Sequence, residues 1–301
     1  MDNLVDAGTR ELGRSGLSVG PLAFGCWRFT HDHVRDARTA LDTALECGMH
    51  LVDTADVYGL DWGGAGFGAC EALLGRVLTD APELRDQIVL ATKGGIHPPV
   101  PYDSGTDGLR RACEASLHRL EVDTIDLYQV HRPDLFAHPE VVAHTLLALR
   151  DEGKIRAIGI SNHTPSQHDV LHAFLGDALA TSQPEYSATH LAPLRDGTFD
   201  RCLRDAVTPL AWSPLAGGRI VSGDGVPPEL LATLDDLAVR EGVTRAAVAI
   251  AFTLAHPARP VSILGTQRPE HLRSSTAALR VHLDRTDCYR IVVASEGQPL
   301  P

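Results

Sequence analysis

The stretch DTADVYGLDWGGAGFGACEALLG, residues 53–75, contains two patterns that predict different folds. Gly64, Gly66 and Ala69 match G-x-G-x-x-A, the phosphate-binding turn of a dinucleotide-binding βαβ unit. In such a unit the glycines directly follow a strand and open a helix. Here a long loop separates Asp53, where an apolar run ends, from Gly64, and the next apolar run ends in a lysine rather than an acid. The spacing therefore argues against a dinucleotide-binding turn, and the glycines indicate a long, mobile loop that frames a pocket.

Short apolar runs rich in β-branched residues alternate with segments of helical period along the whole chain. Near-continuous apolar runs are typical of strands buried on both faces of a parallel sheet. The predicted strands are residues 21–27, 49–54, 87–93, 124–131, 155–161, 178–184, 208–214 and 261–265. The amphipathic segments predicted as helices include residues 34–48, 107–120, 139–153, 228–242 and 244–256.

Eight strand–helix alternations without a low-complexity linker predict a single-domain (β/α)8 barrel, the TIM barrel, over residues 1–301. The alternative is an open, doubly wound sheet with helices on both faces. The turn-rich segment 9–19 precedes the first repeat and predicts a hairpin that closes the bottom of the barrel. Residues 283–301 are expected to form a C-terminal tail.

Composition restricts the partners and the compartment. The net charge of −12 argues against nucleic acid or an anionic membrane as partner. No run of about 18 uninterrupted apolar residues is present to span a bilayer, and the first residues, MDNLVDAGTRELGRSG, do not resemble a secretory signal. The six cysteines are scattered without a C-x-x-C pair, which predicts free thiols in a reducing cytosol. We therefore expect a cytoplasmic protein with a small-molecule partner.

The basic residues are unusual, because only two of the 27 are lysines, Lys93 and Lys154. A chain that uses arginine wherever a generic positive charge suffices has reason to keep lysine where a compact ammonium of adjustable pKa is needed. Both lysines are therefore candidates for a specific role, although chance retention is the alternative.

Polar side chains end three consecutive predicted strands. Asp53, Lys93 and His131 end the second, third and fourth strands, and Tyr58 lies on the loop that leaves the second. In a parallel barrel the carboxyl ends of all strands meet at one rim, where active sites are found. Taken singly, each residue has a structural explanation as a cap or a packing group. Their coincidence at one rim predicts a site.

These four residue types suit the reduction of a carbonyl group. A phenol has a pKa of about 10 and is a weak acid at neutral pH, and a nearby ammonium lowers that pKa. Lys93 is expected to supply this ammonium, with Asp53 paired to it. His131 is expected to hydrogen-bond the substrate carbonyl oxygen and stabilise its developing charge. The set lacks a hydride donor, which a cofactor must supply.

Six motifs in order along nearly the whole chain resemble the aldo-keto reductase family. They are GMHLVDTADVYG (48–59), VLATKGG (89–95), DLYQVHRPD (126–134), GKIRAIGISN (153–162), SQPEYS (182–187) and LAWSPLAGG (210–218). The resemblance implies a (β/α)8 barrel, an NAD(P)H-dependent reduction of an aldehyde or ketone, and an Asp-Tyr-Lys-His tetrad on Asp53, Tyr58, Lys93 and His131. It also implies that Tyr58 is the general acid.

The same resemblance implies a nicotinamide cofactor that lies extended across the barrel mouth. Ser161, Asn162 and Gln183 would hydrogen-bond the carboxamide, and Trp212, where many members carry tyrosine, would stack on the nicotinamide ring. The remaining expected cofactor contacts are Ser213, Leu215, Gly265, Thr266 and Arg268. The expected substrate-pocket residues are Trp27, Arg28, Trp62 and Arg132.

The stretch after the last strand, ILGTQRPEHLRSST (263–276), departs from the pattern that many members use to hold the 2′-phosphate and adenine of NADPH. Gly265 stands where a lysine is common, and His271 stands where an arginine is common. Arg268 and Arg273 remain candidates for binding a phosphate. We expect NADP(H) in preference to NAD(H).

Two other functions are compatible with parts of the sequence. A cofactor-binding regulatory subunit without significant turnover would share the fold, but an intact tetrad argues against it. A metal-dependent barrel hydrolase would use His31 and His33 with His131, but His31 and His33 lie several residues beyond the first strand. We therefore expect no metal site.

Overall fold

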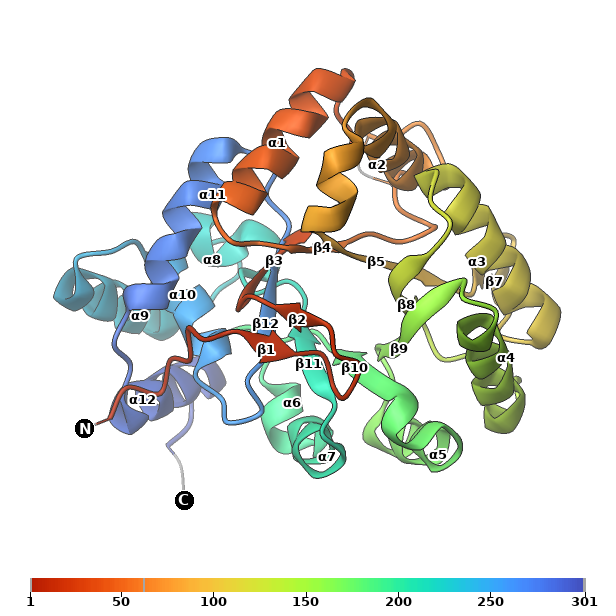
Figure 1. The fold of residues 1–301 in the computed structure, drawn as a ribbon. Helices are drawn as coiled ribbons and strands as arrows, with labels where there is room; N and C mark the ends of the chain where they lie inside the picture. The colour runs from red at the N-terminus through yellow and green to blue at the C-terminus, as the bar shows by residue number, and fades with distance from the viewer. Residues whose placement is uncertain (1, 62, 300–301) are drawn as a thin grey trace.

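Each of the eight predicted apolar runs overlaps one strand of a closed parallel barrel in the computed structural model, which describes residues 2–61 and 63–299 (Figure 1). The order around the barrel is β3-β4-β5-β8-β9-β10-β11-β12, and β12 pairs with β3, so that Leu264 lies beside Phe24. This closure confirms the (β/α)8 barrel and excludes the open sheet. The strands are β3 (Leu22–Gly25), β4 (Leu51–Asp53), β5 (Val89–Gly94), β8 (Ile125–Val130), β9 (Ile155–Ser161), β10 (Leu179–Gln183), β11 (Thr208–Ala211) and β12 (Val261–Leu264).

Helices surround the barrel and bury their apolar faces against the outside of the strands (Figure 1). The α-helices are α1 (Val34–Glu46), α2 (Ala69–Asp80), α3 (Thr106–Leu120), α4 (Pro139–Asp151), α5 (Pro165–Leu175), α6 (Ala192–Arg195), α7 (Thr198–Asp205), α8 (Arg219–Ser222), α9 (Pro228–Glu241), α10 (Arg245–Leu254), α11 (Pro269–Ser275) and α12 (Arg285–Glu296). Short 3-10 helices cover Pro82–Gln87, Gly176–Ala178, Ala216–Gly218 and Thr276–Arg280. None of the helices in the described part of the chain combines the length and the apolar character that crossing a membrane requires.

The predicted N-terminal hairpin closes one end of the barrel. Strands β1 (Arg10–Glu11) and β2 (Ser18–Val19) pair antiparallel and lie across the barrel opening that faces the viewer in Figure 1. Leu12, Leu17 and Val19 pack among the inward-facing apolar residues of the strands in a second, interior core. This end of the barrel is therefore filled by side chains, and the cavity described below opens at the other end.

Several elements were not predicted. Strands β6 (Ile96–His97) and β7 (Val100–Tyr102) form a small hairpin after β5. The C-terminal tail expected over residues 283–301 is largely helical in its described part, residues 283–299, where Asp284 caps α12 in a capping box with Asp287.

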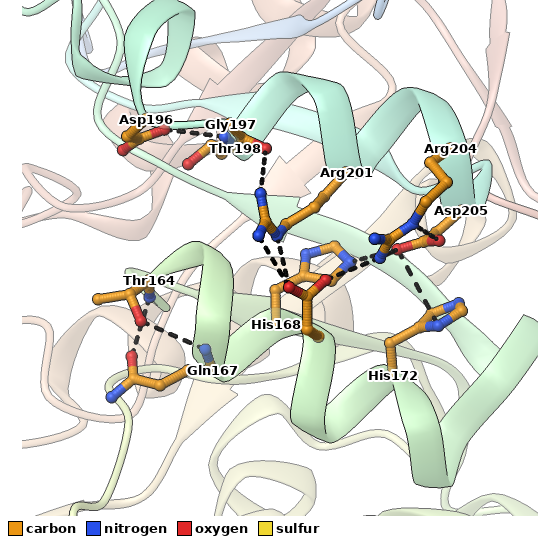
Figure 2. Close-up of polar contacts among 11 residues, drawn as sticks. Thr164, Gln167, His168, His172, Asp196, Gly197, Thr198, Arg201, Arg204 and Asp205 are labelled. Carbon is orange, nitrogen blue, oxygen red and sulfur yellow. Dashed lines mark hydrogen bonds and ion pairs between the residues drawn. The ribbon is translucent and has the colours of Figure 1, made fainter.

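The outer face also carries a polar network, between α5 and α7 (Figure 2). Arg201 and Arg204 each donate to Asp169, at 2.9 and 2.8 Å. The buried His168 contacts Asp205 at 3.2 Å. The network joins two helices on the outside of the barrel, away from the cavity.

Candidate active site

The barrel brings Asp53, Lys93 and Tyr58 into direct contact. The Lys93 ammonium donates to Asp53 Oδ2 at 2.7 Å, to the Thr54 carbonyl oxygen at 2.8 Å and to Tyr58 Oη at 3.0 Å. Lys93 is fully buried and Asp53 is nearly so. All three donors of the ammonium are therefore used, and one of them holds the phenol.

The phenol itself is less acidic than expected. Burial raises the pKa of Tyr58 above its usual value, and the opposing effect of the Lys93 ammonium is smaller. The expected net lowering of the Tyr58 pKa is therefore wrong, because the cost of burying a phenolate outweighs the neighbouring charge. The phenol is protonated at neutral pH, which is the form an acid needs.

His131 lies beside the phenol, immediately after β8. The ring centroids of Tyr58 and His131 are 5.8 Å apart at an interplanar angle of 81°. Burial, together with the charges of Lys93 and Arg132, lowers the pKa of His131 well below its usual value. The imidazole is therefore neutral and carries one N–H for donation.

The other side of the Asp53 carboxylate contacts two amides. Gln129 and Gln183 each direct Nε2 at Asp53 Oδ1, at 3.1 and 3.0 Å. Gln183 was expected at the site for another role, whereas Gln129 was missed. Strand alternation was the available signal, because Gln129 lies two residues before His131 and so faces the same side of β8.

A cavity of about 700 Å³ opens above these residues at the carboxyl ends of the strands. Its volume lies in the range of small-molecule sites, about 300–1,000 Å³. The predicted residues that line it are Asp53, Tyr58, His131, Ser161, Asn162, Gln183, Trp212, Ser213, Leu215, Gly265, Thr266, Trp27, Arg28 and Arg132. Trp62 lies outside the described residues.

The predicted nicotinamide contacts are already joined to one another. Trp212 Nε1 donates to Asn162 Oδ1 at 3.1 Å, while Asn162 Nδ2 donates to the His131 carbonyl oxygen and to Ser161 Oγ. Asn162 and Ser213 have φ angles of 58° and 56°, in the left-handed region that is unusual for residues other than glycine. Such strained backbone is common at binding sites, and here Asn162 accepts the hydrogen bond of the indole at the cavity wall.

The far end of the cavity lacks the arginine that the sequence proposed. Arg268 is ion-paired with Glu270 and does not line the cavity. Arg273 is paired with Glu46 on α1. His271 is a lining residue instead. The cavity as a whole fits an extended nucleotide cofactor: an indole and amides lie near the tetrad, and a glycine-containing backbone follows along the wall.

The loop between β4 and α2 is packed more tightly than its glycines suggested. α2 begins at Ala69, far from the end of β4, so the dinucleotide-binding turn is absent. A Cβ on Gly64 would lie 2.3 Å from the Gly59 carbonyl oxygen. Gly64 therefore permits close contact of two backbone segments and is more than a source of mobility.

The hydrolase alternative receives no support from geometry. Within residues 2–61 and 63–299, no three His, Cys, Asp or Glu side chains are grouped as a metal site requires. His33 precedes the first residue of α1, and the His31 ring packs against Phe29 with centroids 5.5 Å apart.

Two solved structures share the architecture. A thermostable aldo-keto reductase in complex with the inhibitor epalrestat superposes with a TM-score of 0.81 at 28% identity, over 95% of this chain and 99% of that one. An aldo/keto reductase from Klebsiella pneumoniae, in complex with NADP and acetate, also gives a TM-score of 0.81, at 24% identity, over 99% and 98% of the two chains.

Comparison of sequences agrees with comparison of structures. A protein named 6-dehydroglucose reductase, from Novosphingobium aromaticivorans, is 45% identical over 97% of both chains. A second protein of that name, from Agrobacterium fabrum, is 34% identical over 94% of this chain and 96% of its own. The profile described as "Aldo/keto reductase family" matches residues 21–296. With its barrel, its cavity and nearly its whole length accounted for, this chain belongs to the aldo/keto reductase family of oxidoreductases.

Proposed function

We propose that this protein reduces a sugar-derived aldehyde to the alcohol with NADPH, and that Tyr58 is the general acid. The observation that carries the proposal is the position of Tyr58 Oη, 3.0 Å from the buried Lys93 ammonium, beside His131 and facing the cavity. A protonated phenol next to a neutral imidazole provides a proton donor and a hydrogen-bond donor to one carbonyl oxygen.

Each residue of the tetrad has a distinct part. Tyr58 Oη transfers its proton to the substrate oxygen, and the Lys93 ammonium stabilises the phenolate that remains. Asp53 fixes the ammonium and balances its charge. His131 donates a hydrogen bond that orients the carbonyl. The nicotinamide cofactor, when bound, supplies the hydride that the protein itself lacks.

For the cofactor, we assign the carboxamide to Ser161, Asn162 and Gln183 and the nicotinamide face to Trp212. Ser213, Leu215, Gly265 and Thr266 would hold the rest of the molecule. The preference for NADPH over NADH requires that Arg268 leave Glu270 and bind the 2′-phosphate of the cofactor. The Arg268–Glu270 ion pair is exposed, and such pairs contribute little free energy, so this exchange costs little.

The polar rim of the cavity supports a polyhydroxylated substrate. Arg132 lines the cavity next to His131, and no hydrogen bond or ion pair engages its guanidinium within the described chain. Arg28 and Asp61 line the same cavity. Guanidinium and carboxylate groups complement sugar hydroxyls, and the two similar proteins named 6-dehydroglucose reductase make that aldehyde the first substrate to test.

The test is NADPH and NADH oxidation with 6-dehydroglucose, glyceraldehyde, pyridoxal and glucose. We expect turnover with the sugar aldehyde and NADPH, and none with glucose, whose carbonyl is masked as a hemiacetal. Tyr58→Phe should abolish turnover and leave the Kd for NADPH, measured by fluorescence quenching, within about twofold. Tight cofactor binding without turnover on any carbonyl would favour a regulatory subunit instead, and equal loss of binding and turnover would remove Tyr58 from its role.

A further inference from the structure

The Asp53 carboxylate is held from two sides by different partners. Oδ2 accepts from Lys93, whereas Oδ1 accepts from Gln129 and Gln183. Gln183 Nε2 also contacts Gln129 Oε1 at 3.2 Å, so the two amides are joined to each other as well as to the acid. All four residues are at most 2% exposed. Both amides therefore contact the acid inside a buried polar cluster.

The barrel makes room for this contact at a glycine. Gly159 on β9 lies beside Gln129 in the strand register, and Lys93 lies beside Gln129 on its other side. A Cβ at Gly159 would be 2.8 Å from Gln129 Cγ and 2.2 Å from Thr181 Oγ1. The missing side chain thus lets Gln129 and Gln183 reach across β9 and meet.

The orientation of the amides follows from the charge they contact. With the opposite orientation, Gln129 Oε1 would face the carboxylate oxygen, and two acceptors would meet in a buried site. Gln129 therefore acts as a donor and fixes the direction in which Asp53 presents Oδ2. Because Lys93 has no spare donor, a rotation of Asp53 displaces its ammonium from Tyr58 as well.

We propose that Gln129 is a positioning residue of this active site: through Asp53 it holds the Lys93 ammonium against Tyr58 Oη. The inference rests on the proposed function for its effect on turnover. The effect on Lys93 itself can be measured without any turnover.

The chain offers a direct probe, because it contains only two lysines. Lysine labelled with ¹³C at Cε gives two signals, one from buried Lys93 and one from Lys154, which pairs with Glu114 and Glu152 on the surface. Lys154→Arg assigns them. Gln129→Met keeps a side chain of similar length without the amide and should displace the Lys93 signal, while the Lys154 signal stays in place.

Leu127→Met is the matched control. Leu127 lies two residues before Gln129 on β8 and therefore faces the same interior of the barrel. It is fully buried and belongs to the apolar core inside the barrel. This variant should displace neither lysine signal. If Gln129→Met fails to fold, Gln129→Asn serves in its place, since its amide is one carbon too short to reach Asp53, and the same displacement is expected.

In turnover, Gln129→Met should lower kcat about tenfold, as expected for the loss of one hydrogen bond to a charged group, with KM within about twofold. The basic limb of the kcat profile should move by more than about half a pH unit, because the ammonium contributes to the pKa of Tyr58. A Gln129→Met variant with an unmoved Lys93 signal, kcat and pH limb overturns the inference. Failure of the wild-type protein to reduce any carbonyl, or activity retained in Tyr58→Phe, overturns the proposed function instead, and the lysine spectrum still decides the role of Gln129.

Discussion

At the scale of single residues, Asp56 is a buried acid that the proposed reaction does not use. Its side chain is 1% exposed, and burial with the neighbouring Glu71 carboxyl raises its pKa well above the usual 3.8, while Arg119 offsets this only in part. Above that pH the unfolded chain loses this proton and the folded chain keeps it. The free energy of unfolding therefore falls as pH rises, until the pH passes the folded pKa.

Asp56→Asn should remove this pH dependence. We expect the variant to be more stable than the wild type at neutral pH and to lose less stability between about pH 4 and pH 8. Urea unfolding at several pH values measures both. A variant whose stability falls with pH as steeply as the wild type would show that Asp56 is ionised in the folded protein.

The pKa values of the tetrad predict the pH dependence of reduction. The pKa of Tyr58 is raised above 10, so the proton that it donates in the proposed mechanism is present throughout the neutral range and is lost only in strong alkali. The pKa of His131 lies well below 6.5, so its charge does not change near neutrality. We expect kcat for reduction to be flat from about pH 6.5 to pH 9. An inflection near pH 6.5 would show that His131 ionises there and would contradict its neutral role.

The tetrad was predictable from residue types at strand ends, because a parallel barrel places those ends on one rim. The direction of the Tyr58 pKa shift was not predictable, because the depth to which the phenol is buried depends on how the β4–α2 loop folds over the site. Gln129 was not predicted because it lies inside a strand and because its partner Gln183 is far away in the chain. Arg268 was assigned to the cofactor phosphate by its charge alone, whereas in the structure its guanidinium is oriented by the ion pair with Glu270.

At the scale of elements, the loop that carries Tyr58 depends on the contact between Gly59 and Gly64. A Cβ on Gly64 would lie 2.4 Å from Gly59 Cα, next to Tyr58 in the chain. Gly64→Ala should cost about 1–3 kcal/mol of stability through overpacking, and it should lower kcat because Gly59 moves and takes Tyr58 with it.

Gly63→Ala is the control for this prediction. Gly63 has a φ of 75° but open space around its Cβ position, so the substitution strains the backbone without a clash. Its kcat should stay close to that of the wild type. Equal kcat values in the two variants would mean that the Gly59–Gly64 contact does not position Tyr58.

Most barrel strands and helices were predictable because their apolar patterns repeat with a clear period. The hairpin β6–β7 was missed because its residues are largely exposed and residues 96–102 include three prolines, so no buried pattern marks it. The helix α12 was missed for a different reason: its apolar face becomes evident only when Ile291 and Val292 pack into the outer core.

At the scale of the whole molecule, the core of the N-terminal hairpin and the proposed active site lie at opposite ends of the barrel. Leu12 on the N-terminal hairpin is fully buried in the interior core. Leu12→Ala should lower the free energy of unfolding by about 2–5 kcal/mol. At a temperature where the variant remains folded, its kcat and KM should equal those of the wild type, because the tetrad lies at the other end. A selective loss of kcat without destabilisation would contradict this separation.

The N-terminal hairpin, β1 and β2, also limits the routes by which substrate and cofactor reach the cavity. Because the hairpin end of the barrel is filled by side chains, two ligands that share the cavity enter and leave through the same opening. We expect the ligand that binds first to leave last. The kinetics should then follow a compulsory sequence. In initial-rate experiments, the product that leaves last should compete only with the substrate that binds first, and the other product should compete with neither substrate.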